Sequence, residues 1–280
     1  MKRFIIVLLI LLLAATNIGC GMVFEQVRRV AGGQPEETTT AATTAETAEE
    51  TTTQAADPED EPEQEPEEEP YAEVIVEGAP LVHHFEFNNN LNDSLPTGAV
   101  LDIHPNTADS RFSDGAWHWT ASQHPGGGLI LLTDQISDPE NYSIGFRFRV
   151  NDVGPSWKKI LSFREESVDG GLYFYDGKLQ LYPFSVHEDI TYSPDTYYDF
   201  ILSRDTDKMM TVYVVQSDGS ITKVYEEQDL RDESVPVLVD GMYQFMFFTD
   251  DTATSGEWTT GGSVRSIRVW NGPVDEIRFD

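Results

Sequence analysis

The strongest constraint on the fold is a period-two alternation of apolar and polar side chains within residues 71–280. In Tyr142–Val150 the even-numbered residues are all apolar or aromatic, and the odd-numbered ones are serine, glycine and two arginines. Successive side chains of a strand point to opposite faces, so this pattern predicts a β-strand that is buried on one side. Similar runs occupy residues 82–87, 129–132, 160–164, 172–175, 179–184, 198–202, 211–215, 243–248, 264–270 and 274–279.

Turn signals between these runs favour antiparallel pairing. Asp176-Gly177 separates two of them, which is a strong hairpin signal, and Asp218-Gly219 is a second. No segment of ten or more residues shows the 3.6-residue apolar stripe of a helix. The pattern therefore predicts an all-β domain at residues 71–280, an antiparallel two-sheet sandwich of the jelly-roll kind.

Charge and cysteine content exclude several classes of protein. Acidic residues number 49 against 18 Lys and Arg, and the formal net charge is −31. Such a chain lacks the basic surface that grips a phosphate backbone, so we expect no nucleic-acid partner. A single cysteine excludes an internal disulfide and any zinc site built on several thiolates.

The N-terminus has the pattern of an export signal. Lys2 and Arg3 precede an apolar run over residues 4–15. Twelve residues span only about 18 Å as a helix, whereas a bilayer core is about 30 Å thick. We therefore interpret residues 1–19 as a signal peptide and not as a transmembrane helix.

The end of this run resembles the lipobox of bacterial lipoproteins. Gly19 directly precedes Cys20, and Asn17 stands where that family usually has Leu. The resemblance implies that Cys20 is lipidated after cleavage, which would anchor the protein to the outer face of a bacterial membrane. The alternative is an ordinary secretory signal with an incidental cysteine.

Residues 20–70 are predicted to be a disordered tether. Residues 31–70 contain fourteen acidic residues, no Lys or Arg and no aromatic side chain. A Thr/Glu/Pro-rich segment of this composition cannot bury enough apolar surface to fold. A calcium-attracting acidic tract is the alternative interpretation.

Several motifs of residues 82–280 resemble LamG-like, concanavalin A-like domains. Residues 85–94 (FEFNNNLNDS) resemble the start of that family, and residues 267–277 (IRVWNGPVDEI) resemble its closing motif. Residues 160–175 and 200–214 resemble two of its hairpins, in the family order. The resemblance implies a concanavalin A-like jelly roll that binds a ligand.

The same resemblance suggests a structural calcium ion near the chain ends. Asn90 and Asp93 in the opening motif and Asp275 in the closing motif are the predicted ligands, since calcium takes oxygen donors. The alternative is that Asp93 caps a turn and Asp275 is solvated. Asp250 and Asp251 form a second acidic loop with the same two interpretations.

Exposed aromatic rings are the candidates for binding a sugar, because a flat apolar ring can stack on a pyranose. Trp157 and Trp258 rank first, since Gly, Pro and Ser around them favour loops. Tyr173 and Tyr175 share one face of a predicted strand. For each of these rings, packing in the core is the alternative.

Other residues are interpreted as structural. Trp117 and Trp119 share a face of their strand and are predicted to lie in the core. The six histidines lack the spacing of a metal motif, and the neighbours His83 and His84 must point to opposite faces.

A catalytic constellation is not evident. Residues 227–233 (EQDLRDE) superficially match the Glu-x-Asp-x-x-(x)-Glu strand of β-glucanases, in which the acids share one face of a strand. The residues between the acids here are Gln, Leu, Arg and Asp, which could not pack into a sandwich core. We interpret the segment as a charged loop and expect no enzymatic activity.

The sequence thus favours a surface lipoprotein, expected to be monomeric, whose non-catalytic jelly roll binds a glycan or another surface or matrix component. One alternative is a glycoside hydrolase or lyase of the same superfamily. The other is a purely structural or protein-adhesion domain. Sequence does not separate this last alternative from the glycan-binding one.

Overall fold

The computed structural model describes residues 74–187, 190–215, 220–274 and 276–279, which contain strands and no helix. Accordingly, no described helix is long and apolar enough to cross a membrane. The signal peptide, Cys20 and the predicted tether lie outside the described residues. The strands are β1 (Val74–Glu77), β2 (Leu81–Phe85), β3 (Asp102–Ile103), β4 (Thr107–Ser113), β5 (Ala116–Ala121), β6 (Leu129–Thr133), β7 (Tyr142–Val150), β8 (Trp157–Ser162), β9 (Gly171–Tyr175), β10 (Lys178–Tyr182), β11 (Ser185–His187), β12 (Tyr198–Arg204), β13 (Met209–Val215), β14 (Ile221–Gln228), β15 (Leu238–Val239), β16 (Met242–Phe247), β17 (Gly261–Trp270) and β18 (Glu276–Phe279).

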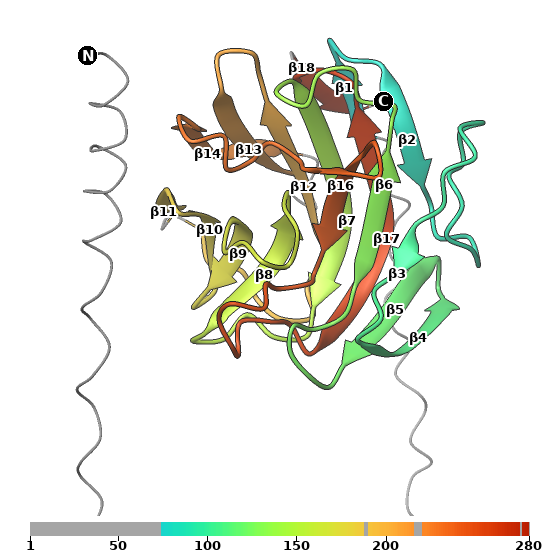
Figure 1. Cartoon of the computed structure of the whole chain (residues 1–280), viewed down its shortest axis with the longest axis vertical. Coiled ribbons are helices and arrows are strands. Elements are labelled where there is room, and N and C mark those ends of the chain that lie inside the picture. Colours follow the sequence, from blue (N-terminus) through green and yellow to red (C-terminus); the bar gives the residue numbers. More distant parts are fainter. Residues whose placement is uncertain (1–73, 188–189, 216–219, 275, 280) are drawn as a thin grey trace, which may run out of the picture. The chain divides into compact units, whose positions relative to one another are not determined.

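The described strands form two antiparallel eight-stranded sheets and one separate pair (Figure 1). The first sheet has the order β11-β10-β9-β8-β16-β6-β3, with β15 beside β16. The second has the order β14-β13-β12-β7-β17-β5-β4, with β2 beside β17. This is the predicted two-sheet jelly-roll sandwich.

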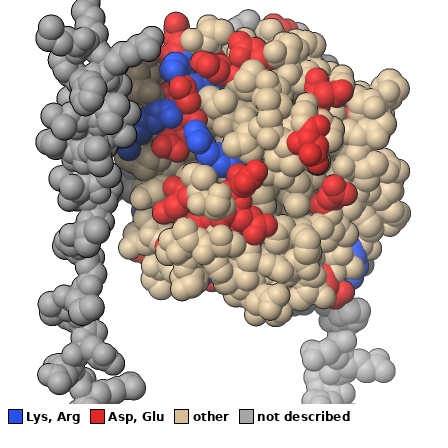
Figure 2. Space-filling model, in the orientation of Figure 1, with Lys and Arg blue, Asp and Glu red and all other residues tan. Residues whose placement is uncertain are grey.

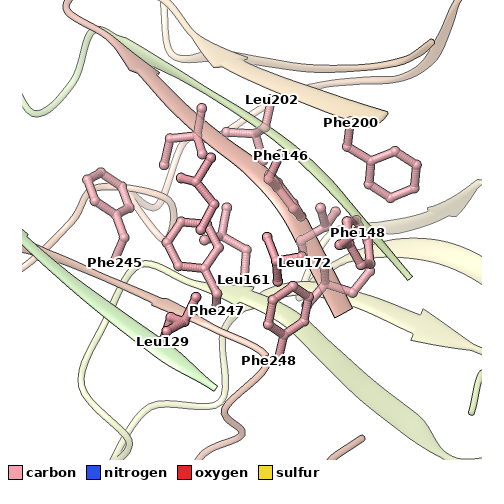
Figure 3. Packing of buried hydrophobic residues seen from close by; sticks show 14 of the residues in the cluster. Leu129, Phe146, Phe148, Leu161, Leu172, Phe200, Leu202, Phe245, Phe247 and Phe248 are labelled. Atoms are coloured by element: carbon pink, nitrogen blue, oxygen red, sulfur yellow. The ribbon is translucent and has the colours of Figure 1, made fainter. Parts of the chain in front are cut away.

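Aromatic side chains fill the space between the sheets (Figure 3). Phe146 of β7 lies edge-on to Phe247 of β16, with ring centroids 5.7 Å apart. Phe148 stacks against Phe174 of β9 at 6.2 Å. These contacts join the two sheets, so burial of apolar rings holds the sandwich together.

The period-two pattern placed several elements correctly. Strand β7 has the predicted bounds, and the Asp176-Gly177 turn joins β9 to β10 with positive φ at both residues. Trp117 and Trp119 are buried in the core and stacked on each other, as predicted. The second predicted turn, Asp218-Gly219, lies outside the described residues.

The outer face of the second sheet is partly covered by the chain's own terminal strands. Trp270 of β17 packs there with Ile201 and Val215 in a small separate cluster. Ile277 of β18 and Val274 pack against this cluster, and β18 pairs with β1. Apolar side chains on this outer face are therefore buried by the fold itself.

Candidate functional site

The outer face of β8, β9 and β10 carries four aromatic rings, Trp157, Tyr173, Tyr175 and Tyr182, which we call the aromatic face. Alternation along β9 buries its even-numbered side chains in the sandwich core and turns Tyr173 and Tyr175 outward. The antiparallel register then places Trp157 opposite Tyr175. Strand pairing thus brings residues that are distant in sequence onto one surface.

Trp157 is the centre of the aromatic face. Its ring centroid lies 4.6 Å from that of Tyr175, 5.5 Å from that of Tyr173 and 5.7 Å from that of Tyr182. Trp157 and Tyr182 are half-buried, and Tyr175 is 38% exposed. These three rings thus reach solvent while Trp157 contacts the other two, which is the condition for stacking on a ligand. Tyr173, by contrast, is 0% exposed, so it supports Trp157 from beneath and does not itself reach a ligand.

Polar groups border the aromatic face. Gln180 of β10 lies opposite Tyr173 in the sheet, and its buried Oε1 accepts no hydrogen bond from any described residue. The hydroxyl of Tyr173 donates to Asp169 at 3.1 Å. Hydrogen-bonding groups next to stacking rings are the arrangement that recognises sugar hydroxyls.

Beyond Tyr173 lies an ionic group that we call the acidic cluster: Asp169, Asp250, Asp251 and Glu257 around Lys159. Lys159 is buried on β8, with its Nζ 5.0 Å from the centre of the Tyr173 ring. Nζ lies 3.3 Å from Oδ2 of Asp251 and 3.5 Å from Oδ1 of Asp250. Four carboxyl groups thus share one ammonium group, an excess of negative charge that raises the cost of keeping all four ionised.

The two adjacent aspartates of the cluster differ in their hydrogen bonds. Asp251 accepts hydrogen bonds from the N–H groups of Ala253 and Thr254, which together with Lys159 outweigh the effect of burial and lower the pKa of Asp251. No described side chain donates a hydrogen bond to Asp250, and the N–H of Asp251 offsets its burial only in part. Burial therefore raises the pKa of Asp250 to about 7, against the lowering effect of Lys159.

Three carboxylates of the acidic cluster could hold a metal ion. One oxygen each from Asp169, Asp251 and Glu257 lie within 4.8 Å of one another. Burial, followed by the charges of Asp169 and Asp251, raises the pKa of Glu257 above its ordinary value. An all-oxygen donor set that is short of positive charge suits calcium.

A cavity of about 440 Å³ lies on the outer side of the same sheet. Ile130, Gln244 and Met246 line it from the sheet, and Glu166 and Thr252 line it from two loops. The loops are tied together, because the N–H of Thr252 donates to the carbonyl of Glu166. The outer surface of this sheet is therefore hollowed beyond the aromatic face.

The structure places the other predicted sugar-binding residue in a loop. Trp258 is half-buried, and a Cβ atom on Gly126 would lie 2.8 Å from the Cβ of Trp258. Trp157 contacts the rings of Tyr173, Tyr175 and Tyr182, and Trp258 is not part of this group. Trp157 was expected to lie in a loop, but it is the first residue of β8.

The predicted calcium ligands of the opening motif are engaged in turns. Asp93 accepts hydrogen bonds from the N–H groups of His84 and Leu95, from Thr97 and from Nδ1 of His83. These bonds outweigh burial and lower the pKa of Asp93. The side-chain oxygen of Asn90 accepts from a backbone N–H two residues along. Asp275 lies outside the described residues, so calcium binding by this set stays a prediction.

The segment at residues 227–233 begins at the end of β14 and continues as a loop. Asp229 is buried there and accepts hydrogen bonds from Ser234 and from the N–H of Glu233. Its Oδ2 lies 3.6 Å from Nε of the buried Arg204. Asp229 thus holds the loop together in an internal ion pair.

On the face drawn in Figure 2, acidic side chains are widespread, and the Lys and Arg side chains lie among them.

Comparison with known proteins shows similarity of fold alone. No family model matches the chain, and no curated protein matches it. A botulinum neurotoxin type C structure, from work on its interaction with two ganglioside molecules, matches with a TM-score of 0.50 and 13% identity over 70% of this chain and 48% of the toxin chain. A Trypanosoma rangeli sialidase with sialic acid matches with a TM-score of 0.48 and 11% identity over 70% of this chain and 31% of the sialidase chain. The chain therefore spans about half the length of the toxin structure it matches.

Sequence reasoning missed Tyr182, Lys159, Asp169 and Glu257 as candidate residues. Tyr182 could have been found, because the Asp176-Gly177 hairpin fixes which side chains of β10 share a face with those of β9. The acidic cluster joins β8 and two loops, and no local pattern connects them.

Proposed function

We propose that this chain is a LamG-like, non-catalytic glycan-binding domain that is displayed on the bacterial surface by a lipid on Cys20. The aromatic face carries the proposal: Trp157 contacts three tyrosines, and the group remains partly open to solvent. A sugar ring would stack on Trp157 and Tyr175, and polar groups beside Tyr173 would take its hydroxyls.

The fold is compatible with this proposal. The botulinum neurotoxin type C structure shares the fold, and its cell entry is described as dependent upon interaction with two ganglioside molecules. A shared fold does not carry a shared ligand by itself, so the proposal rests on the rings and not on the likeness.

We also propose calcium as a structural ion of the acidic cluster. The carboxylates of Asp169, Asp251 and Glu257 would hold it, because their oxygens lie close together and carry excess negative charge. A divalent cation would offset that charge and fix the loops beside Tyr173.

The test of glycan binding is a glycan array with the purified chain, run with calcium and again with a chelator. Trp157→Ala is expected to weaken binding about tenfold, the equivalent of about 1.4 kcal/mol of lost stacking. Tyr213→Ala is the matched control, since Tyr213 is a half-buried tyrosine on the other sheet and should leave binding unchanged.

Two results would contradict this proposal. Glycan binding that survives Trp157→Ala would place the ligand elsewhere on the domain. No glycan bound in either condition would favour a protein-adhesion or structural role.

A further inference from the structure

One end of the second sheet's outer face carries a row of polar side chains that crosses four strands. Arg111 of β4 lies opposite His118 of β5 in the sheet register. Ser263 of β17 lies opposite both His118 and Arg149 of β7. Their neighbours along β5 and β7 lie in the core, so alternation turns the row outward. The row is at the opposite end of β17 from Trp270, where the terminal strands cover the sheet.

This row lines a cavity of about 150 Å³, which we call the arginine cavity. Arg111 and Arg149 both border it, together with Asp109, Thr120 and Asn151. Arg149 is half-buried and the other four are exposed, so the cavity opens to solvent. Since a water molecule takes about 30 Å³ in the liquid, the cavity has room for one small polar unit.

The two arginines of the cavity differ from other basic residues of this acidic chain. Lys158, Arg204 and Arg268 lie 2.9, 2.9 and 2.8 Å from a carboxylate oxygen. Neither Arg111 nor Arg149 forms an ion pair with a described carboxylate, although the chain has 49 acidic residues for 18 basic ones. Two guanidinium groups that border one cavity without a carboxylate partner indicate an anion from outside the chain.

The guanidinium group of Arg149 is held in place by its surroundings. Its Nε donates a hydrogen bond to Oγ of Ser263 at 2.9 Å. Its Cζ lies 5.4 Å from the ring centre of Tyr197, and Cζ of Arg265 lies 4.4 Å from the same ring centre. Among the described residues, none accepts a hydrogen bond from the Nη groups of Arg149. Arg149 is therefore oriented before a ligand arrives and retains donors for it.

We propose that the arginine cavity binds the carboxylate of an acidic sugar, a uronic acid unit of a polysaccharide. The planar fork of a guanidinium group matches a carboxylate with two parallel hydrogen bonds. The carboxylate of Asp109 would accept hydrogen bonds from sugar hydroxyls, and it would repel a doubly charged phosphate. Asn151 and Thr120 offer further partners for hydroxyls, which a carboxylate of an acidic peptide would leave unused. The site lies on the sheet opposite the aromatic face, so it goes beyond the function proposed above and does not depend on it.

The test is calorimetric titration of the purified chain with polygalacturonate, in which every sugar unit carries a carboxylate. Its fully methyl-esterified form, dextran sulfate and polyglutamate are the comparison ligands. A chelator is present throughout, so calcium contributes nothing to the signal. Salt at about 0.15 M limits the Debye length to about 8 Å, which screens the distant negative charges of the chain. We expect saturable binding of polygalacturonate and at least tenfold weaker binding of each comparison ligand, roughly the effect of losing one charged hydrogen bond.

Matched variants identify the residues that bind. Arg111→Ala and Arg149→Ala should each weaken polygalacturonate binding about tenfold, because each removes a charged donor. Arg149→Lys should also weaken it, since an ammonium group cannot bind a carboxylate through a planar fork. Arg231→Ala removes the same charge from an exposed turn after β14 and should leave binding unchanged. Arg111 is exposed, so its variant should fold as the wild type does, which urea unfolding checks.

Several results would overturn the proposal. Equal binding of the methyl ester would show that the carboxylate is not recognised. Equal or tighter binding of dextran sulfate or polyglutamate would assign a different ligand to the cavity. Full affinity in both Arg111→Ala and Arg149→Ala would place the sugar elsewhere. If Trp157→Ala abolishes binding and the arginine variants keep it, the acidic sugar binds at the aromatic face, so the arginine cavity is excluded while the aromatic face is retained.

Discussion

The two outer faces of the sandwich both carry tryptophan, but the fold treats them differently. Trp270 on the second sheet is 3% exposed, because the segments around β1 and β18 cover it. Trp157 on the first sheet is half-buried and is contacted by tyrosines of its own sheet. An apolar ring that the chain covers contributes to stability, whereas a partly exposed ring is available to contact a ligand.

The two faces also differ in how closely their buried charged groups are paired. On the covered face, Arg268 donates to both oxygens of Asp199, at 2.8 Å and 3.0 Å. On the open face, Nζ of Lys159 is 3.3–3.5 Å from its partners, and no described side chain donates a hydrogen bond to Asp250. Buried charges with well-formed hydrogen bonds are typical of structural sites, whereas poorly paired buried charges are typical of functional sites.

The largest effect on stability is expected from Trp270→Ala. Removing this ring should lower the free energy of unfolding by about 3–5 kcal/mol, because the terminal strands cannot collapse into the cavity. Urea unfolding measures the loss, and glycan binding by the folded fraction should not change. A loss below about 1 kcal/mol would show that the covered face contributes little to stability.

Removal of calcium is expected to have the next largest effect. At a calcium concentration one hundred times Kd, bound ion adds about 2.7 kcal/mol, which a chelator should remove. Thermal unfolding with calcium or chelator measures this difference. It should vanish in Asp169→Asn and persist in Asp93→Asn; the reverse would favour the ligands in the opening motif.

Calcium binding should also weaken as the pH falls from 7 toward 5. Burial and the neighbouring aspartates raise the pKa of Glu257, so this carboxyl group takes up a proton at a higher pH than an ordinary glutamate and then cannot bind the ion. Calorimetric titration at several pH values measures the affinity. Affinity that is constant over this range would contradict a role for Glu257.

Gly145→Ala tests the packing beneath Trp270. A Cβ atom on Gly145 would lie 2.9 Å from two ring carbons of Trp270, so the ring must shift. Overpacking of this kind is expected to cost about 1–3 kcal/mol of unfolding free energy. Gly98→Ala cannot serve as its control, because a side chain at the positive φ of 76° would strain the backbone even though space is open there.

The smallest effect on stability is expected from Trp157→Ala. Its ring is half-buried, so unfolding in urea should change by about 1 kcal/mol, mainly from lost contacts with tyrosines. The same variant should give the loss of glycan binding described above. A stability loss equal to that of Trp270→Ala would mean that Trp157 is structural, and the contrast between the faces would fail.

Local patterns predicted much of the fold. Alternation alone placed Phe146 and Phe148 in the core, and Asp176-Gly177 marked a hairpin that the structure contains. These succeed because the period of a strand and the φ angles of a tight turn depend on neighbouring residues only. The start of β8 was missed, because glycine, proline and serine before Trp157 suggested a loop.

The candidate site was only partly predictable, because local sequence patterns do not reveal contacts between distant parts of the chain. By itself the sequence determined that Tyr173 and Tyr175 share a face, since strand geometry fixes that relation. Only the tertiary structure decided that Trp157 joins them and that Lys159 lies between Asp250 and Asp251. Those contacts depend on which strands become neighbours in the sheet, and that choice is made by burial of the whole core, not by any short stretch of chain.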